Sequence, residues 1–219
     1  MGNLLEVINV SKSYGSETIF TDISFTLMRG KVLALTGQSG SGKTTLLSVV
    51  GLLQQATAGQ VVVDGTDVAG LDQQEQARLR GRLYGYVFQR ARLINSLTAL
   101  ENVLVPAWLS RAGRGTEKRA RELLTNFDLA HRLDHRPQEL SLGQLRRVAL
   151  ARALLLKPAI ILADEPTNDL DPALAASIAD SLLAARADGA GIIIVTHDPA
   201  LAARADERLN LEKGRLATA

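Results

Sequence analysis

Alternating apolar and polar positions near the start of the chain predict strands. Ile23, Phe25 and Leu27 alternate with polar residues, which is the pattern of a strand that buries one face. The β-branched run Val61–Val63 precedes Asp64-Gly65, an order typical of a strand followed by a turn. The first third of the chain is therefore predicted to consist mainly of short strands.

An apolar run followed by glycine-rich sequence lies among these strands. Lys31–Thr36 is the apolar run, and the helical segment Lys43–Leu53 follows the glycines. The middle of the chain, about residues 90–156, is predicted to be mostly helical. Its predicted helices are Leu93–Leu109, Glu117–Asp128 and Ser141–Leu156.

Two later apolar runs predict strands that are buried on both faces. Ala159–Ala163 and Gly191–Val195 are typical of a parallel sheet covered by helices, and the helical segment Ala173–Arg186 between them completes a βαβ unit. Arg208–Leu211 and Arg215–Ala217 predict a closing hairpin. The predicted fold class is α/β, with an antiparallel part at the start and a helical insertion in the middle.

The composition is that of a folded protein. The 219 residues fit one domain, 1–219, and the 46% hydrophobic and 22% charged content is ordinary for globular chains. The net charge is only +2 with scattered Lys and Arg, so no nucleic-acid partner is expected. Cysteine is absent, which excludes disulfides and thiolate zinc sites.

The sequence shows no signal for membrane insertion of its own. No apolar stretch approaches the roughly 18 to 20 residues of a membrane span, and the first residues lack the basic and apolar regions of a signal peptide. A role at a membrane would therefore require a separate spanning partner.

Residues 37–44 read GQSGSGKT, which fits the phosphate-loop pattern G-x-x-x-x-G-K-[ST] between a predicted strand and a predicted helix. Glycines let backbone N–H groups surround phosphate oxygens, and the helix N-terminus adds partial positive charge. Lys43 is expected to reach the β- and γ-phosphates, and the Thr44 hydroxyl to ligate Mg²⁺. The nucleotide-binding residues expected here are Gly37, Ser39, Gly40, Ser41, Gly42, Lys43, Thr44 and Thr45.

Two carboxylates end the predicted strand Ala159–Ala163. Asp164 is expected to hold Mg²⁺ through water, and Glu165 is free to act as general base because successive strand residues face opposite ways. A nucleotide kinase has no use for a water-activating carboxylate at this place. The other interpretation is that both acids are surface residues at a strand end.

Leu140–Gln144 reads LSLGQ, directly before a helical run. This segment resembles the LSGGQ signature of the ATP-binding-cassette (ABC) family, and the likeness extends over nearly the whole chain. The resemblance implies an ATPase that uses ATP and Mg²⁺. It also implies a P-loop NTPase core with an N-terminal antiparallel β subdomain and a helical subdomain inserted at about residues 90–156.

The resemblance assigns further roles. Tyr14 matches the aromatic residue that stacks on adenine, and Gln89 matches the glutamine that touches Mg²⁺ and senses the membrane partner. His197 matches the switch histidine on the γ-phosphate, and Asp171 belongs to a segment that matches the D-loop. The implied catalytic residues are Lys43, Gln89, Glu165 and His197. The implied metal-binding residues are Thr44, Gln89 and Asp164.

In the family, two such domains face each other head to tail, with ATP between the phosphate loop of one and the signature loop of the other. The resemblance therefore implies a homodimer in which Ser141, Gly143 and Gln144 contact the nucleotide of the partner. The sequence departs from the family at Leu142, which replaces a glycine, and at the continuation Gln144-Leu-Arg-Arg147, where Q-x-Q-R is usual. We expect activity to survive Leu142 with an altered turnover.

Ser96–Val103 and His135–Ser141 resemble one subfamily of macrolide exporters, lipoprotein-release and haem-export ATPases, and the cell-division ATPase. This likeness implies a separate integral-membrane permease, a position at the cytoplasmic face of the membrane, and export of a drug, lipoprotein, lipid or haem. The alternative is an ATPase that transmits force for cell division or cell-wall remodelling without moving a substrate. A soluble cassette acting on ribosomes or DNA is a weaker rival, because such proteins carry two cassettes or a long coiled coil.

Overall fold

The computed structural model describes residues 3–113 and 115–218. A four-stranded antiparallel sheet has the strand order β2-β1-β4-β5. Its strands are β1 (Asn3–Tyr14), β2 (Glu17–Met28), β4 (Ala58–Val63) and β5 (Thr66–Asp67). Ile23 and Leu27 are buried in β2, as the alternating pattern predicts. The prediction of short strands is wrong for β1 and β2, which have 12 residues each.

A second, six-stranded sheet has the strand order β10-β9-β3-β8-β7-β6. All neighbouring strands are parallel except the hairpin of β9 and β10. The strands are β3 (Val32–Thr36), β6 (Tyr84–Val87), β7 (Ile160–Asp164), β8 (Gly191–Val195), β9 (Glu207–Glu212) and β10 (Arg215–Thr218). The two predicted buried strands and the closing hairpin are confirmed.

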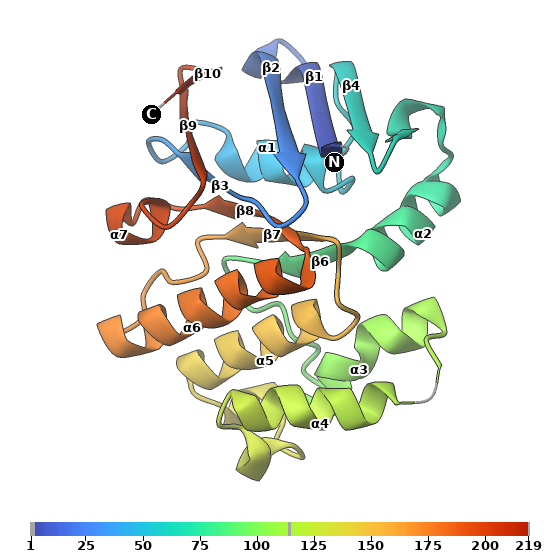
Figure 1. Cartoon of the computed structure of the whole chain (residues 1–219), viewed down its shortest axis with the longest axis vertical. Helices are drawn as coiled ribbons and strands as arrows, with labels where there is room; N and C mark the ends of the chain where they lie inside the picture. The colour runs from blue at the N-terminus through green and yellow to red at the C-terminus, as the bar shows by residue number, and fades with distance from the viewer. Residues whose placement is uncertain (1–2, 114, 219) are drawn as a thin grey trace.

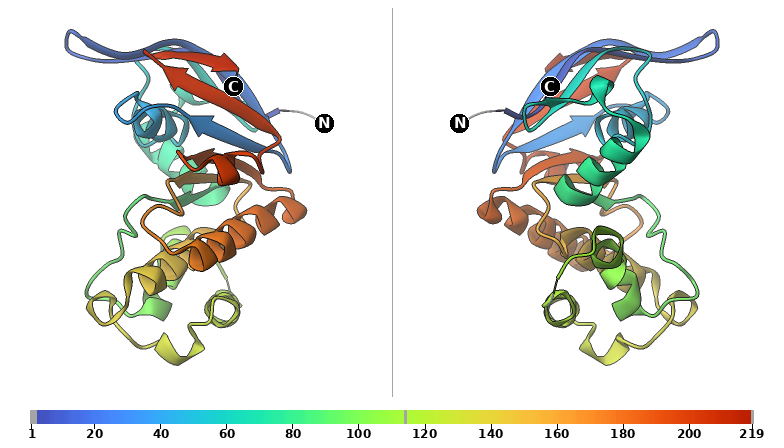
Figure 2. Two further views of the ribbon diagram at one scale, coloured as in Figure 1. Left: turned by 90° about the vertical axis from the view of Figure 1, so that its left-hand side faces the viewer. Right: turned by 90° about the vertical axis from the view of Figure 1, so that its right-hand side faces the viewer.

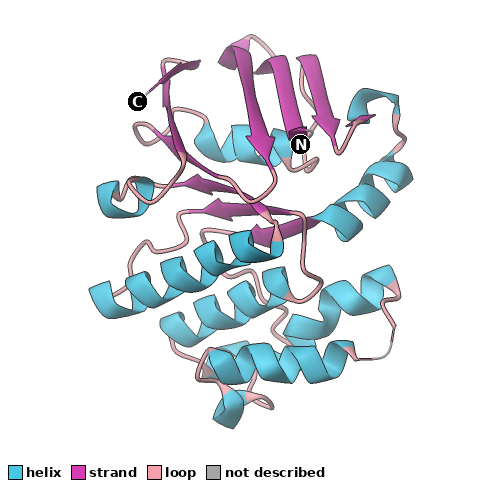
Figure 3. Ribbon diagram, in the orientation of Figure 1, coloured by secondary structure: helices cyan, strands magenta, loops and turns pink. Residues whose placement is uncertain are grey.

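Helices cover both faces of the six-stranded sheet (Figures 1 and 3). The α-helices of the described residues are α1 (Lys43–Val50), α2 (Gln73–Leu83), α3 (Ala99–Ser110), α4 (Thr116–Asn126), α5 (Leu142–Leu154), α6 (Pro172–Ala184) and α7 (Pro199–Ala202). Short 3₁₀ helices join them at Val68–Gly70, Ala130–Arg132, Pro137–Glu139 and Ala185–Asp188. Within the described residues, none of these helices has the length and apolar character needed to span a bilayer.

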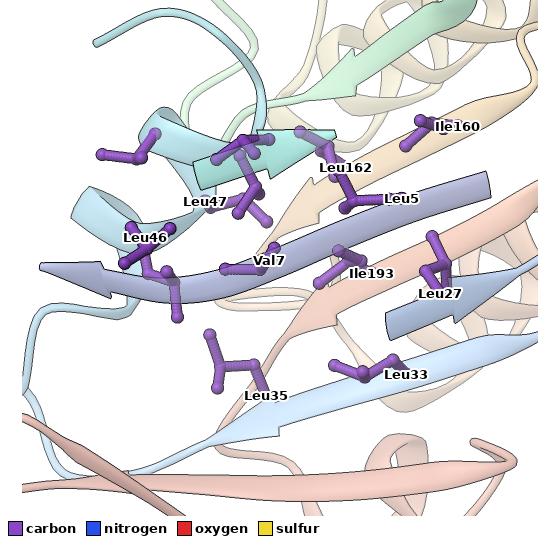
Figure 4. Close-up of a cluster of buried hydrophobic side chains, with 14 of the residues drawn as sticks. Leu5, Val7, Leu27, Leu33, Leu35, Leu46, Leu47, Ile160, Leu162 and Ile193 are labelled. Atoms are coloured by element: carbon purple, nitrogen blue, oxygen red, sulfur yellow. The ribbon is translucent and has the colours of Figure 1, made fainter. Parts of the chain in front are cut away.

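The buried strands alternate between two cores because successive side chains point to opposite faces of the sheet. Ile160 and Leu162 of β7 enter the core that α1 and the antiparallel sheet complete (Figure 4). Ile161 and Ala163 enter the core beneath α5 and α6. Loss of such a buried leucine or isoleucine side chain typically costs about 2–5 kcal/mol, so both cores hold the strand ends in place.

A third core lies apart from the sheets, among α3, α4 and α5. Its fully buried members include Val103, Leu124 and Val148, one from each helix. The two side views show these helices below the six-stranded sheet, on the side away from the antiparallel sheet (Figure 2). The fold is α/β, with the antiparallel sheet at one end and this helical part at the other.

The predicted helix Leu93–Leu109 is wrong at its start, because α3 begins at Ala99. Thr98 and Glu101 form a capping box that fixes this start. The fully buried Asn102 side chain binds the carbonyl oxygens of Ile94, Leu97 and Thr98, and it accepts from the Ile94 amide. Because the Asn102 side chain satisfies these backbone groups, the residues before Thr98 do not need helical hydrogen bonds.

Other boundaries differ too. The predicted helix Lys43–Leu53 ends at Val50, with Gly51 as its C-cap and Leu52 in the left-handed region. The sequence analysis missed α2, which a capping box of Asp72 and Glu75 begins. It also missed β6, which occupies the sheet edge and leads into the loop that carries Gln89.

Candidate nucleotide site

The phosphate-loop residues connect the end of β3 to the start of α1. Gly37 has φ +138°, and a Cβ atom there would lie 2.3 Å from the carbonyl oxygen of Leu211. Gly42 has φ +98° and would place a Cβ 2.8 Å from Ile19. Both positions therefore require glycine, on conformation and on space. The loop has a shape in which backbone amides and the start of a helix face one point, as an anion site needs.

Lys43 lies inside this loop and is 8% exposed. Its ammonium group donates to the carbonyl oxygens of Gly37 at 2.8 Å and Gln38 at 2.7 Å. These partners are neutral, so the positive charge of Lys43 is left available to an anion such as a phosphate.

Thr44 and Asp164 meet where α1 passes the end of β7. The Thr44 hydroxyl donates to Oδ2 of Asp164 at 2.9 Å, while Oδ1 is buried and has no hydrogen-bond partner among the described residues. Burial raises the pKa of Asp164, the charge of Glu165 raises it further, and the Thr44 hydrogen bond and Lys43 oppose this. A buried carboxylate oxygen without a partner, beside a hydroxyl, fits a divalent cation such as Mg²⁺.

Glu165 follows Asp164 in the left-handed region, with φ +46°. Its amide donates to the carbonyl oxygen of Val195, which ties it to the end of β8. The carboxylate accepts from the backbone amide of His197 at 3.4 Å and lies 2.9 Å from Nδ1 of that histidine. The Glu165 side chain is 14% exposed and the His197 side chain 64%, so the pair joins a sheltered carboxylate to an accessible ring.

A cavity of about 620 Å³ brings together the three residues predicted to bind metal. Thr44, Gln89 and Asp164 all line it, although they come from three separate parts of the chain. Gln89 is exposed in the loop that follows β6. The three side chains therefore line one common cavity, of which Tyr86 and Phe88 form further walls.

Tyr14 ends β1 and is 48% exposed. Its hydroxyl donates to the side-chain oxygen of Gln54, and the Lys12 ammonium lies 4.7 Å from the ring centroid. Gln54 lines the cavity described above, so Tyr14 stands at its border. An accessible aromatic face beside a cation suits a flat, polarisable ligand.

The signature residues lie at the N-terminus of α5, outside the lining of that cavity. Ser141 is the N-cap, and its side chain and that of Gln144 form a capping box. A Cβ atom on Gly143 would lie 2.5 Å from Leu174 of α6. Leu142 is 50% exposed beside them. Asp171, in turn, is the N-cap of α6 and accepts from the Leu174 amide.

Sequence reasoning missed part of the surroundings. Arg146 and Arg152 of α5 bind backbone carbonyl oxygens of the segment 88–92, which contains Gln89. Gln54 was missed as the partner of Tyr14. The available signal was the presence of three arginines, Arg146, Arg147 and Arg152, in an otherwise mostly apolar helix, where a charged group needs a partner.

Comparison with known proteins decides the family. The profile described as ABC transporter matches residues 20–168, which is more than half of the chain. The chain belongs to the ABC transporter family. Its curated relatives and solved neighbours agree that it is an ABC ATPase, an enzyme that binds and hydrolyses ATP.

Two relatives match the ABC ATPase over nearly their full lengths. The lipoprotein-releasing system ATP-binding protein LolD of Porphyromonas gingivalis is 41% identical over 97% of this chain and 98% of its own. LolD of Myxococcus xanthus is 44% identical over 99% of both. The macrolide export ATP-binding/permease protein MacB of Campylobacter jejuni is 41% identical over 95% of this chain but only 33% of its own.

Solved structures with a similar fold are also ABC cassettes. The dimeric post-hydrolysis state of the ATP-binding cassette MJ0796, bound to ADP and Pi, has a TM-score of 0.91 and 36% identity. The match covers 98% of both chains. The α/β fold with its antiparallel sheet and helical part is therefore that of an ABC ATPase domain.

Proposed function

We propose that this ABC ATPase powers a separate integral-membrane permease and that the complex exports a lipoprotein or another amphipathic lipid. The main support for this proposal is the likeness to the two LolD proteins, which covers 97–99% of this chain and almost the full length of each LolD chain. MacB is named as both ATP-binding protein and permease, and this chain corresponds to a third of it. Macrolide-like drugs and haem are the further substrates that the subfamily resemblance implies.

The phosphate loop and Tyr14 bind the nucleotide in this proposal. Backbone amides of Gly37–Thr45 and the Lys43 ammonium hold the phosphates, and the Tyr14 ring stacks on adenine. Thr44, Gln89 and Asp164 would hold Mg²⁺, which neutralises charge on the phosphate oxygens when bound.

Glu165 is proposed to act as the general base. Its carboxylate takes a proton from the water whose oxygen attacks the γ-phosphorus, and the bond to the β-phosphate oxygen breaks to leave ADP. The nearby His197 ring orients this carboxylate and would donate to a γ-phosphate oxygen, because its Nδ1 lies 2.9 Å from Glu165 and most of the ring is exposed.

A homodimer completes the site in this proposal. Ser141, Gly143 and Gln144 are at a helix N-terminus and outside the cavity of their own chain, so they are free to bind the nucleotide of a partner. Asp171 would lie at the same interface. The dimeric MJ0796 cassette supports this arrangement.

The proposed domain is a single one, 1–219, with a helical subdomain at about residues 90–156. The separate core of α3, α4 and α5 supports this division.

A groove of about 1000 Å³ lies between α2, α3 and α5. Six arginines and no acidic residue are found among the described residues that line it, so it suits a permease segment that combines apolar and acidic side chains. The ATPase would thereby be held at the cytoplasmic face of the membrane.

Copurification tests this proposal. The tagged ABC ATPase, extracted with detergent from membranes of the source cells, should retain a multi-span membrane protein. The double variant Arg78→Glu with Arg82→Glu, in the groove, should lose that protein, whereas Arg208→Glu on β9 should keep it. Absence of any membrane protein from the wild-type preparation would contradict the proposal.

The substrate is tested separately. Vesicles containing the copurified complex and a radiolabelled lipoprotein should release the lipoprotein to an acceptor when ATP is added. ATP hydrolysis without release of lipoprotein, drug or haem would instead support the force-transmitting alternative.

A further inference from the structure

The loop that carries Gln89 is held by the helix that carries the signature. Arg152 of α5 donates to the carbonyl oxygens of Ala91 at 2.8 Å and Arg92 at 2.9 Å. Arg146, six residues earlier on the same helix, donates to the carbonyl oxygen of Phe88 at 3.4 Å. Three of the five carbonyl oxygens in the segment 88–92 are thus bound by α5. Gln89 is exposed between these anchor points.

The same loop is also closed on itself. Arg92 has φ +44°, a strained conformation for a residue with a side chain. Its guanidinium lies 5.0 Å from the centroid of the Phe88 ring, and that ring stacks on Tyr86 at 5.6 Å. Strain of this kind persists only where surrounding contacts hold it, and the two bonds from Arg152 are such contacts.

Arg146 is an unusual residue for its position. It is 5% exposed, and its Nε has no hydrogen-bond partner among the described residues. Burial lowers the pKa of Arg146, and the nearby charge of Asp169, two residues before Asp171, raises it. The family pattern has glutamine at this place. Burying an incompletely paired guanidinium between two loops of the site lowers the free energy of unfolding. We therefore expect Arg146 to have a role that offsets this loss of stability.

The loop separates two cavities. Tyr86, Phe88 and Arg92 line both the nucleotide-site cavity and the groove among α2, α3 and α5. Arg152 lines the groove, and α5 starts at the Ser141 cap. One helix therefore connects the signature, the groove and the loop of Gln89.

We propose that Arg146 and Arg152 are positioning residues that clamp the loop 88–92 to α5 and thereby fix where Gln89 lies relative to Thr44 and Asp164. The inference rests on the proposed role of Gln89 at Mg²⁺.

Replacement of Arg152 tests the clamp in the full-length ABC ATPase. Arg152→Gln should lower kcat about tenfold, because two hydrogen bonds from a charged donor are lost. The Kd for ATP should stay within about twofold, because Lys43 and the phosphate loop are untouched. The Mg²⁺ concentration for half-maximal activity should rise, and amides 89–92 should exchange hydrogen faster while β6 and α5 keep their protection.

Two further variants distinguish loss of the clamp from a general loss of structure. Arg152→Lys keeps the charge but cannot bind two carbonyl oxygens as a fork, so its kcat should be intermediate. Arg147→Gln is the matched control, because Arg147 on the same helix donates to Phe127 within the helical part. Its kcat and Mg²⁺ dependence should be those of the wild type.

Wild-type kcat and Mg²⁺ dependence in Arg152→Gln would overturn the clamp. An equal loss in ATP affinity and in kcat would also overturn it, since that pattern means damage to the whole site. If Arg152→Gln does not fold, Arg146→Met applies the same readouts to the other anchor. Failure of the proposed function looks different, because then Gln89→Ala itself leaves the Mg²⁺ dependence unchanged.

Discussion

At the scale of single residues, the buried carboxylate of Asp164 is the clearest conflict between stability and function. Burial raises its pKa above the ordinary 3.8. Between that value and the raised one, the folded chain binds more protons than the unfolded chain. The free energy of unfolding therefore falls as pH rises through this window, and above it Asp164 opposes folding.

Asp164→Asn should for this reason stabilise the nucleotide-free protein by about 1 kcal/mol at neutral pH and abolish Mg²⁺-dependent ATP hydrolysis. The asparagine oxygen can still accept from Thr44. Thermal unfolding without nucleotide and a phosphate-release assay measure the two effects. A lower Tm in the variant would contradict this, because it would mean that the ionised Asp164 carboxylate stabilises the folded protein.

Leu142 tests how far the altered signature matters. Its side chain is half exposed at the start of α5, while the Ser141 cap is intact and Gly143 is retained. Leu142→Gly should therefore change kcat by less than about tenfold and cost up to about 1 kcal/mol in stability, because glycine is a poor helix residue. A gain in kcat of several hundredfold would mean that the native loop is degenerate.

At the scale of elements, the Asn102 side chain holds the segment that leads into α3, beside the capping box of Thr98 and Glu101. Asn102 is fully buried, donates to three carbonyl oxygens and accepts from one amide. Asn102→Ala leaves these backbone groups unsatisfied and should destabilise the chain by about 2–4 kcal/mol. Asn95→Ala, in the same loop but exposed, is the matched control. Equal urea unfolding curves for the two variants would contradict this account.

The elements that sequence predicts best are those with a simple, uninterrupted pattern. Gly191–Val195 is apolar throughout and forms β8 with the same bounds. The phosphate loop is recognisable because glycine is required at Gly37 and Gly42. The start of α3 at Ala99 was not predictable, because the Asn102 side chain binds backbone groups of the residues just before it, which therefore do not continue the helix.

In the candidate site, too, some features could be predicted from the sequence and others could not. Thr44 and Asp164 were paired by chemistry alone, and the structure places them in hydrogen-bond contact. The contact of Glu165 with His197 joins the ends of two strands that lie 32 residues apart in the sequence, and it required the sheet order. The arginine anchors of the loop 88–92 were hidden, since their partners are backbone carbonyl oxygens, which carry no sequence signal.

At the scale of the whole molecule, the two halves of the proposed site lie on different parts of one chain. The phosphate loop lies between the two sheets, beside α1, and the signature lies at the start of α5 beyond the six-stranded sheet (Figure 1). A single copy therefore offers both halves without joining them in one cavity. Two copies arranged head to tail would form two complete sites.

The mass of Glu165→Gln in solution tests this claim most directly. Without its general base the variant should bind ATP and Mg²⁺, hardly hydrolyse it, and elute at twice the monomer mass in light scattering. Adding Lys43→Ala or Ser141→Arg to the variant should return it to a monomer. A monomer at saturating ATP, or wild-type hydrolysis by Glu165→Gln, would contradict the account.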